Sequence, residues 1–205
     1  MILTYHEVKF FSGHENTVGF FTFLKQMLFL KWNKIRVVSL SKYRNDKREV
    51  VITFDDGYSC ISRWAVPILS ILKIPFSIFI CEKFLLLAEN GDKKYLNVKE
   101  LYKIVKNGGG IEYHSKSHYC LTEINDIEEL KKEIALPDII KTIDPLGGKF
   151  FAYPFWKHND CIRQIVAEEY CGARSGNGFA NGTSFAMDSV KVTSHLSFST
   201  LFKDW

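Results

Sequence analysis

The stretch "EVVITFDDGY" (49–58) combines a strand signal with a polar turn: the apolar run 50–54 leads straight into Asp55-Asp56-Gly57. β-Branched and aromatic residues in an unbroken run are typical of a buried strand, and Asp and Gly are common turn residues. Similar short runs recur along the chain, at 1–5, 35–40, 74–80, 110–113, 149–153, 171–175 and 190–194.

Helix-like stretches separate most of these runs, at 62–73, 97–109, 125–143 and 158–170. Strands that alternate with helices predict an α/β chain whose parallel sheet is covered by helices. An open doubly wound sheet and a closed barrel both satisfy this pattern. Neither G-x-G-x-x-G nor the P-loop motif is present, which argues against the nucleotide-binding versions of such folds.

Composition predicts a single domain over residues 1–205, with 46% hydrophobic residues and a net charge of +4. The lysines are scattered, so the sequence indicates no nucleic-acid partner. The most apolar stretch, 18–32, is interrupted by polar residues and has helical spacing, so we expect a helix packed on the core and no stable membrane insertion. Five cysteines without a C-x-x-C pair, and a start without a basic signal-peptide region, predict a cytoplasmic protein.

Polar residues follow four of the predicted strands where parallel α/β folds gather their functional groups. Each has a structural explanation when taken alone, such as a turn or a surface histidine. A carboxylate and two imidazoles together can form a metal site that leaves positions open for water, and a second carboxylate could accept a proton. On a helical turn the H-x-x-x-H spacing would place both imidazoles on one face. The candidates are Asp55, Asp56, His114, His118 and His6.

Two other metal-enzyme classes do not fit. The H-E-x-x-H motif of metalloproteases requires Glu where this sequence has Ser115. The zinc deaminases require H-x-E and P-C-x-x-C, and both are missing.

Three segments resemble the motifs of the polysaccharide deacetylases, the NodB-homology or carbohydrate esterase family 4 proteins. They are "TFDDGY" (53–58), "HSKSH" (114–118) and "FAYPFW" (151–156), and the resemblance covers roughly residues 50–175. It implies a distorted (β/α)7-type barrel of parallel strands with outer helices. It also implies metal-dependent removal of N-acetyl groups from amino sugars in a glycan or glycan precursor.

The resemblance also implies roles for individual residues. Asp56, His114 and His118 would bind the metal, usually Zn²⁺, although another divalent transition metal is compatible, and Asp55 would be the general base. A backbone N–H near Tyr153 would stabilise the oxyanion. The remaining residues expected at the substrate are Tyr153 and Pro154 beside the acetyl group, and Tyr58, Phe155 and Trp156 against a sugar face.

The sequence departs from the family pattern at two points. The third motif usually begins with an Arg that orients the base, whereas Ala152 or a neighbour holds that position here, and we expect Arg174 to substitute for it. The usual last motif, which supplies the general acid, is poorly matched by His195. "ILTYHEV" (2–8) resembles the first strand of a permuted branch of the family, which favours His6 as the acid.

Alternative functions follow from the same departures. The chain could be an inactive deacetylase-like module that binds glycans, or a hydrolase of another small amide or of an O-acyl sugar. The predicted substrate is an N-acetylated sugar in surface-glycan synthesis, and the sequence does not indicate an oligomeric state. Metal content together with acetate release would separate these alternatives.

Overall fold

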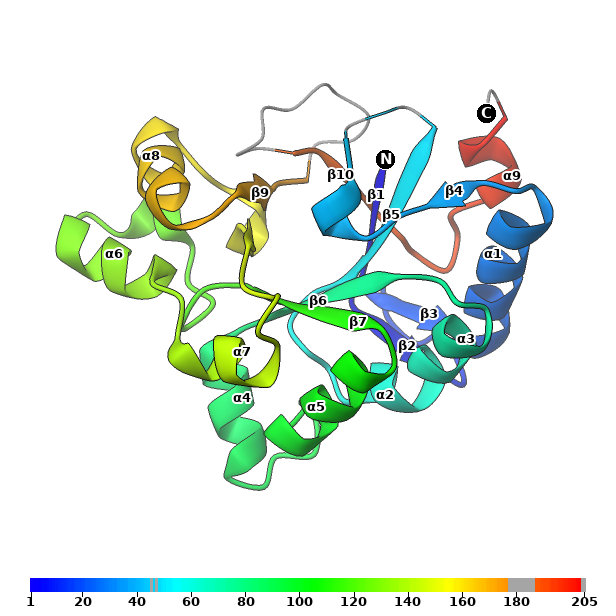
Figure 1. Cartoon of the computed structure of the whole chain (residues 1–205), viewed down its shortest axis with the longest axis horizontal. Helices are drawn as coiled ribbons and strands as arrows, with labels where there is room; N and C mark the ends of the chain where they lie inside the picture. The colour runs from blue at the N-terminus through cyan, green and yellow to red at the C-terminus, as the bar shows by residue number, and fades with distance from the viewer. Residues whose placement is uncertain (45, 47, 177–186, 204–205) are drawn as a thin grey trace.

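The computed structural model describes residues 1–44, 46, 48–176 and 187–203. Seven parallel strands form its central sheet in the order β10-β1-β5-β6-β7-β8-β9, and a short strand, β4, pairs with the start of β5 (Figure 1). Two further strands, β2 and β3, form a separate parallel pair. The strands are β1 (Ile2–Tyr5), β2 (Glu7–Lys9), β3 (Thr17–Gly19), β4 (Arg36–Val37), β5 (Glu49–Phe54), β6 (Phe76–Ile80), β7 (Gly109–Tyr113), β8 (Phe150–Ala152), β9 (Gly172–Arg174) and β10 (Ser189–Lys191).

The sheet curls into a nearly closed barrel. Met187, two residues before β10, donates its N–H to Ala173 of β9 at 2.9 Å and accepts the N–H of Ser175 at 2.8 Å. On the other edge of β10, Ser189 lies opposite Ile2 of β1. These contacts connect the two ends of the strand order, so the seven-stranded barrel is confirmed and the open sheet is excluded.

Helices cover the outside of the barrel, with α6 and α8 on one side and α1, α3 and α9 on another (Figure 1). Every residue of β1, β5 and β6 is buried, as expected for strands that lie between a barrel interior and a helix layer. The helices are α1 (Phe20–Trp32), α2 (Cys60–Trp64), α3 (Val66–Ile71), α4 (Glu82–Glu89), α5 (Val98–Lys106), α6 (Ile127–Ile134), α7 (Asp138–Ile143), α8 (Asp160–Glu169) and α9 (Phe198–Leu201).

Proline divides two of the predicted helices. The stretch 62–73 forms α2 and α3, with Pro67 in the first turn of α3, and the stretch 125–143 forms α6 and α7 on either side of Pro137. Proline lacks an N–H and restricts the residue before it, so it is tolerated at the start of a helix and not in its interior. The side chains of Asp126 and Asn159 cap the starts of α6 and α8.

Two expectations about elements are wrong. The predicted strand 35–40 shortens to Arg36–Val37, and helix α4, which follows β6 directly, was not predicted. The sequence of α4, "EKFLLLAE", contains four consecutive phenylalanine or leucine residues and gives a weaker helical period than α5 or α6.

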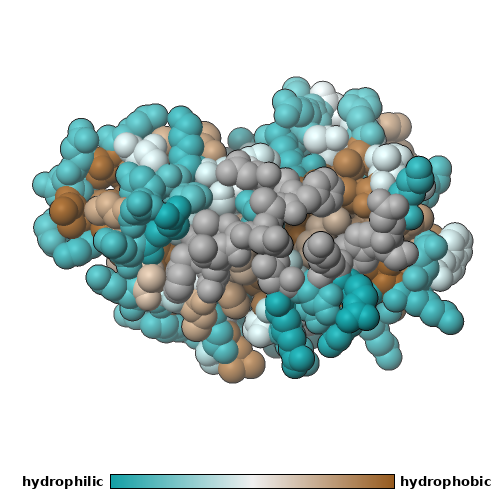
Figure 2. Space-filling view, turned by 90° about the horizontal axis from the view of Figure 1, so that it is seen from above, coloured by the Kyte–Doolittle hydropathy of each residue, from teal (hydrophilic) through white to brown (hydrophobic). Residues whose placement is uncertain are grey.

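Helix α1 packs on the core through Phe23, Met27 and Leu30, as predicted, while Phe21 and Trp32 are exposed. Within the described residues, no helix combines the length and the apolar character that a bilayer crossing requires. Seen from above, much of the visible outer surface is hydrophilic, with apolar side chains in separate small patches (Figure 2).

Candidate active site

Asp55 and Asp56 lie where β5 ends. Asp55 still belongs to the sheet ladder, since its N–H donates to the carbonyl of Tyr5 at 2.9 Å. Asp56 and Gly57 have φ of 66° and 70°, so the chain turns sharply away from the strand. A side chain at Gly57 would approach Ile80 to 2.7 Å in addition to the strain of positive φ, so only glycine fits there. The turn directs the two neighbouring carboxylates to different partners.

His114 and His118 come from the loop after β7. His114 continues the ladder through its N–H to Ile80 at 2.9 Å. The segment between the histidines is not a helical turn, because Ser115 and His118 have φ of 68° and 58°. The two imidazoles nevertheless lie together, with ring centroids 4.9 Å apart. The loop therefore brings the two rings side by side without the helical turn that we expected.

The three predicted metal ligands converge. Asp56 Oδ1 lies 3.5 Å from His114 Nε2 and 3.1 Å from His118 Nε2, and one donor atom from each residue lies within 4.8 Å of the others. Tetrahedral Zn²⁺ with bonds of ~2.0–2.1 Å holds its donor atoms about 3.3 Å apart. The observed separations fit such an ion. In the part of the chain that the structure describes, no other group of three or more potential ligands meets in this way.

The tautomer of His114 also fits a metal. Its Nδ1 lies 2.8 Å from the carbonyl oxygen of Ala152, which can only accept, so Nδ1 carries the proton. The lone pair of Nε2 therefore faces Asp56 Oδ1, which is buried and has no hydrogen-bond partner among the described residues. Lone pairs that face one another across a buried space are stabilised by a cation between them. A carbonyl behind a ligating imidazole is a usual way to orient such a ligand.

The charges of the site suit cation binding. Burial lowers the pKa of His114 to about 4, so its imidazole is neutral at neutral pH. Burial alone would raise the pKa of Asp56, but His118, His114 and His6 outweigh it and lower the pKa to about 2. Burial alone would lower the pKa of His118, as it does for His114, but the interaction with Asp56 outweighs burial and raises the pKa of His118. A proton and a cation thus compete for the same lone pair of His118.

Arg174 holds the second carboxylate. The guanidinium is completely buried, and its Nη2 donates to Asp55 Oδ1. Its Nη1 donates to the hydroxyls of Thr4 and Ser189, both at 3.2 Å, and its Cζ lies 4.9 Å from the ring centre of Phe79. Arg174 therefore takes the position beside Asp55 that we expected of it, from β9 instead of the third motif.

His6 lies next to Asp55, whereas His195 does not. His6 follows β1, and its Nε2 is 3.9 Å from Asp55 Oδ2. Its Nδ1 is buried without a hydrogen-bond partner among the described residues. His195 is an exposed residue in the turn after β10. Of the two candidate acids, the structure brings His6 to the site.

The aromatic residues differ in how they reach the site. Phe155 is 59% exposed and its ring lies 4.9 Å from that of His118. Trp156 is half-buried, and a side chain on Gly176 would overlap its indole ring at 2.0 Å. Tyr58 is half-buried and stacks on Tyr95, with ring centroids 5.4 Å apart.

Tyr153 and Pro154 lie in the segment that directly follows β8. Both residues are buried, and the Tyr153 ring packs against Phe151 and His158. The Tyr153 N–H donates to the carbonyl of Arg174 at 3.1 Å as part of the ladder between β8 and β9. Because that N–H is already bonded, Tyr153 itself is not the oxyanion donor.

Sequence reasoning missed several residues of the site. The backbone carbonyl of Ala152 carries no sequence signal, and Thr4 and Ser189 are ordinary strand residues. Phe84 of the unpredicted helix α4 lies 5.5 Å from the His118 ring and stacks on Tyr95 at 4.4 Å. These residues become part of the site only through the order of the strands.

A nearly closed parallel barrel with carboxylates and imidazoles gathered at its strand ends is consistent with the result of the family comparison. The family model described as "Polysaccharide deacetylase" matches residues 42–171. The chain therefore belongs to the polysaccharide deacetylase family.

Individual relatives share only low sequence identity with this chain. The protein YxkH of Bacillus subtilis (strain 168), itself named only provisionally as a polysaccharide deacetylase, is 25% identical over 186 residues. That alignment covers 85% of this chain and 62% of YxkH, so the chain spans less than two thirds of that relative.

Solved structures share the fold. The deacetylase PplD of Streptococcus pyogenes, solved with acetate, superposes with a TM-score of 0.86 at 20% identity, covering 98% of this chain and 96% of PplD. A de-N-acetylase from Aggregatibacter actinomycetemcomitans gives a TM-score of 0.80 at 16% identity, with 98% of each chain covered. At these identities the likeness establishes the fold alone.

Proposed function

We propose that the chain is a Zn²⁺-dependent hydrolase that removes the N-acetyl group from an amino sugar in a glycan or glycan precursor. The observation that carries the proposal is the convergence of Asp56, His114 and His118 at zinc-ligand separations, beside a second carboxylate, Asp55. Family membership supports deacetylation as the reaction. The metal, its identity and the amino-sugar substrate are parts of the proposal.

The three ligands would hold the metal through Asp56 Oδ1 and the Nε2 atoms of the two histidines. A bound Zn²⁺ would lower the pKa of a ligated water from ~16 toward ~7, and it would also polarise the acetyl carbonyl. Asp55 accepts the proton of the attacking water. Arg174 keeps Asp55 oriented through the hydrogen bond from its Nη2 to Asp55 Oδ1.

His6 donates the proton that the leaving amine needs. Its position, with Nε2 3.9 Å from Asp55 Oδ2, supports this role, as does the exposed position of His195. This is the arrangement of the permuted branch that the N-terminal sequence resembles. The oxyanion donor would be an N–H of the turn after Tyr153, and because Pro154 has none, Phe155 is the next residue that can supply it.

Phe155 and Tyr58 would contact the sugar. Phe155 is exposed beside His118, and Tyr58 lies two residues after Asp56, where burial and the charge of Asp56 raise the pKa of its phenol. Trp156, the next residue, would line the sugar site together with Phe155.

The test combines metal analysis with product analysis. Purified protein loaded with Zn²⁺ is incubated with oligosaccharides of N-acetylated amino sugars, and free acetate is measured before and after treatment with a chelator. We expect one Zn²⁺ per chain and acetate release that the chelator abolishes and Zn²⁺ restores. Glycan binding without acetate release would identify an inactive binding module, and release only from O-acetyl or other small amide substrates would replace the proposed substrate.

We also propose a cytoplasmic location, which the five free cysteines support because oxidising compartments favour disulfides. Fractionation of cells followed by detection of the protein tests this. Recovery of the protein outside the cytoplasm would refute it.

A further inference from the structure

The loop that carries both histidines is bonded on two sides. Its carbonyls face the start of α4: the N–H of Glu82 donates to Ser115 at 3.2 Å, and the N–H of Lys83 donates to Lys116 at 2.8 Å. The first N–H groups of a helix lack partners within it, so they are natural donors to such a loop. The thiol of Cys81, just before α4, adds a third donor on this side, with its Sγ 3.4 Å from the carbonyl oxygen of Lys116.

The other side is held by one residue, Glu133 of α6. The carbonyl of Glu133 accepts the N–H of Lys116 at 3.0 Å. Its carboxylate accepts the N–H of Ser117 at Oε2, at 3.0 Å, and the hydroxyl of Ser117 at Oε1. Two of the three backbone N–H groups between the histidines, those of Lys116 and Ser117, therefore bond to Glu133.

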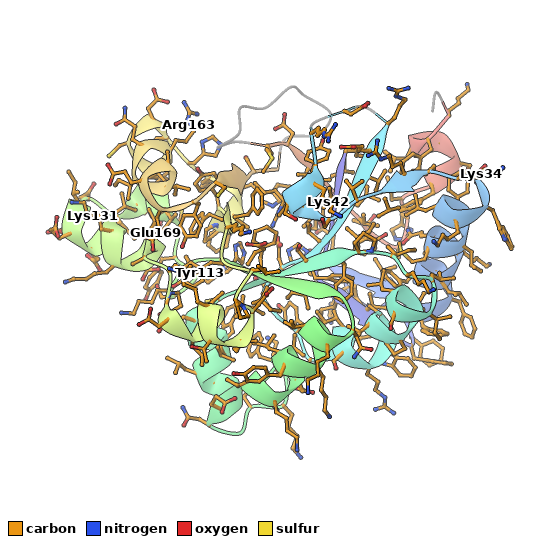
Figure 3. The ribbon with its side chains drawn as sticks, viewed as in Figure 1. Lys34, Lys42, Tyr113, Lys131, Arg163 and Glu169 are labelled. Carbon is orange, nitrogen blue, oxygen red and sulfur yellow. The ribbon has the colours of Figure 1, made fainter. Side chains whose placement is uncertain are left out.

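Glu133 is an unusual residue for its position. It is only 8% exposed and shares the buried face of α6 with Leu130 and Ile134, whereas Lys131 projects from the outer face (Figure 3). Among the described residues no Lys or Arg pairs with it, and burial of a carboxylate is costly unless hydrogen bonds compensate. The donors from Ser117 supply that compensation.

Helix α6 is itself anchored at this point. The hydroxyl of Tyr170, from the end of α8, donates to the carbonyl of Ile134 at 2.6 Å. Glu133 thus projects from an anchored helix, and its hydrogen bonds fix the position of the 115–118 loop relative to that helix.

The loop needs an external constraint. Ser115 and His118 both have the left-handed backbone that non-glycine residues avoid, at a cost of roughly 1 kcal/mol or more each. Such a conformation persists only where surrounding contacts impose it. The backbone of His118 determines where its imidazole lies relative to Asp56, so the constraint acts directly on a candidate ligand.

We propose that Glu133 is a positioning residue for the metal site: its carboxylate holds the 115–118 loop so that His118 Nε2 faces Asp56 Oδ1, and metal affinity depends on it. The proposal rests on the proposed role of Asp56, His114 and His118 as ligands. Neither the sequence motifs nor the family match singles out this residue.

The experiment measures Zn²⁺ affinity by competition with a chromophoric chelator, using the full chain after metal removal. Loss of a group that orients a ligand typically weakens metal binding ~10–100-fold, and we expect Glu133→Ala to fall in this range. Glu133→Gln should rescue part of the affinity, because its amide oxygen still accepts the Ser117 N–H and its amide nitrogen can donate to the hydroxyl. Ser117→Ala removes only the hydroxyl contact and should cause a smaller loss.

Glu128→Ala is the matched control. Glu128 lies on the same helix with a side chain that is 74% exposed, and its contact is an exposed pair with Lys131. It should bind Zn²⁺ like the unmodified protein. Substitution of Co²⁺ adds a spectroscopic readout: its visible absorption reports ligand geometry and should change in Glu133→Ala but not in Glu128→Ala.

The outcomes separate this inference from the proposed function. Tight binding by the unmodified protein with equal binding by Glu133→Ala and Glu133→Gln would overturn the positioning role and leave the metal site standing. Absence of Zn²⁺ binding by the unmodified protein would overturn both. If Glu133→Ala does not fold, as judged by circular dichroism, Glu133→Gln and Ser117→Ala decide: unchanged affinity and Co²⁺ spectra in these two variants also refute the inference.

Discussion

Asp55 and Asp56 are consecutive residues with different surroundings. Asp55 remains in the strand ladder and is bonded to Arg174, whereas Asp56 has left the ladder through a positive φ and faces two imidazoles. The same side-chain chemistry can therefore serve as a base at one position and as a metal ligand at the next. The two roles are separable by mutation.

Asp55→Asn should reduce acetate release by ~10²–10⁴-fold while Zn²⁺ stays bound, because an amide cannot accept the proton of the attacking water. Turnover and bound zinc are measured on the same preparation. Asp56→Asn is the counterpart, and it should lose zinc as well as activity. Loss of zinc from Asp55→Asn in proportion to its activity would show that Asp55 is a ligand.

His6→Ala should slow acetate release by about 10²-fold or more with no change in bound zinc, because the leaving amine then lacks its proton donor. An activated acetyl ester such as 4-nitrophenyl acetate, whose leaving group needs no proton, should lose far less rate.

His195→Ala is the control for His6→Ala, since His195 is exposed after β10. It should keep nearly full activity. The permuted arrangement is refuted if His195→Ala is the slower of the two variants.

At the scale of elements, β7 and β8 pair at a single register, Tyr113 with Phe151, and carboxylates bridge the rest of the gap. Asp144 accepts the N–H of Ile111 at 3.0 Å, and Glu112 Oε2 accepts the N–H groups of Lys149 and Phe150 at 2.8 and 2.9 Å. Side chains here replace ladder bonds that the splayed strands cannot form. The strand that leads to His114 thus depends on two buried acids.

Glu112 should make stability depend on pH. Burial, with a smaller contribution from the charge of Asp144, raises the pKa of Glu112 to about 8, outweighing the backbone donors and Lys149. Between the unfolded pKa of ~4.3 and about 8, the unfolded chain is ionised while the folded chain keeps the proton, so stability falls as pH rises through this window. The loss should be on the order of a few kcal/mol in urea unfolding.

Glu112→Gln should flatten this pH profile, because glutamine does not titrate. The exposed residue Glu168 offers a control, and Glu168→Gln should keep the slope of the unmodified protein. An unchanged slope in Glu112→Gln would mean that Glu112 is ionised in the folded protein at neutral pH.

At the scale of the whole molecule, Arg174 joins the two ends of the strand order. From β9 it reaches Thr4 of β1, Ser189 of β10 and Asp55 after β5, so it contributes both to closure of the barrel and to the site. Arg174→Leu leaves Asp55 buried and unpaired, and breaking a buried pair in this way typically costs ~3–5 kcal/mol. Urea unfolding measures the loss.

The matched control is the double variant Arg174→Leu with Asp55→Leu. It removes both charges, and replacement of a buried pair by apolar residues is often close to neutral, so it should recover much of the lost stability. A double variant as unstable as Arg174→Leu would show that the hydrogen bonds to Thr4 and Ser189 carry the stabilisation instead.

The sequence predicted the strands that lead to the site with good accuracy, because each is a short run of buried residues followed by a polar group. The predicted runs at 50–54 and 74–80 match β5 and β6 closely. Helix α4 was missed because its leucine-rich segment has little helical periodicity. The division of 62–73 into two helices was missed because the sequence alone does not show whether Pro67 starts a new helix or lies within one.

Local sequence by itself determined the candidate ligands, because a carboxylate after one strand and two histidines after another are visible as motifs. The tertiary structure decided which distant residues complete the site. Arg174 lies 119 positions from Asp55, and Glu133 lies on an outer helix, yet both hold site residues through hydrogen bonds. The choice of His6 over His195 likewise follows from β1 lying beside β5. The resemblance could suggest Arg174 and His6 but not where they lie, and nothing in the sequence indicated Glu133, because strand order and barrel closure arise from long-range packing.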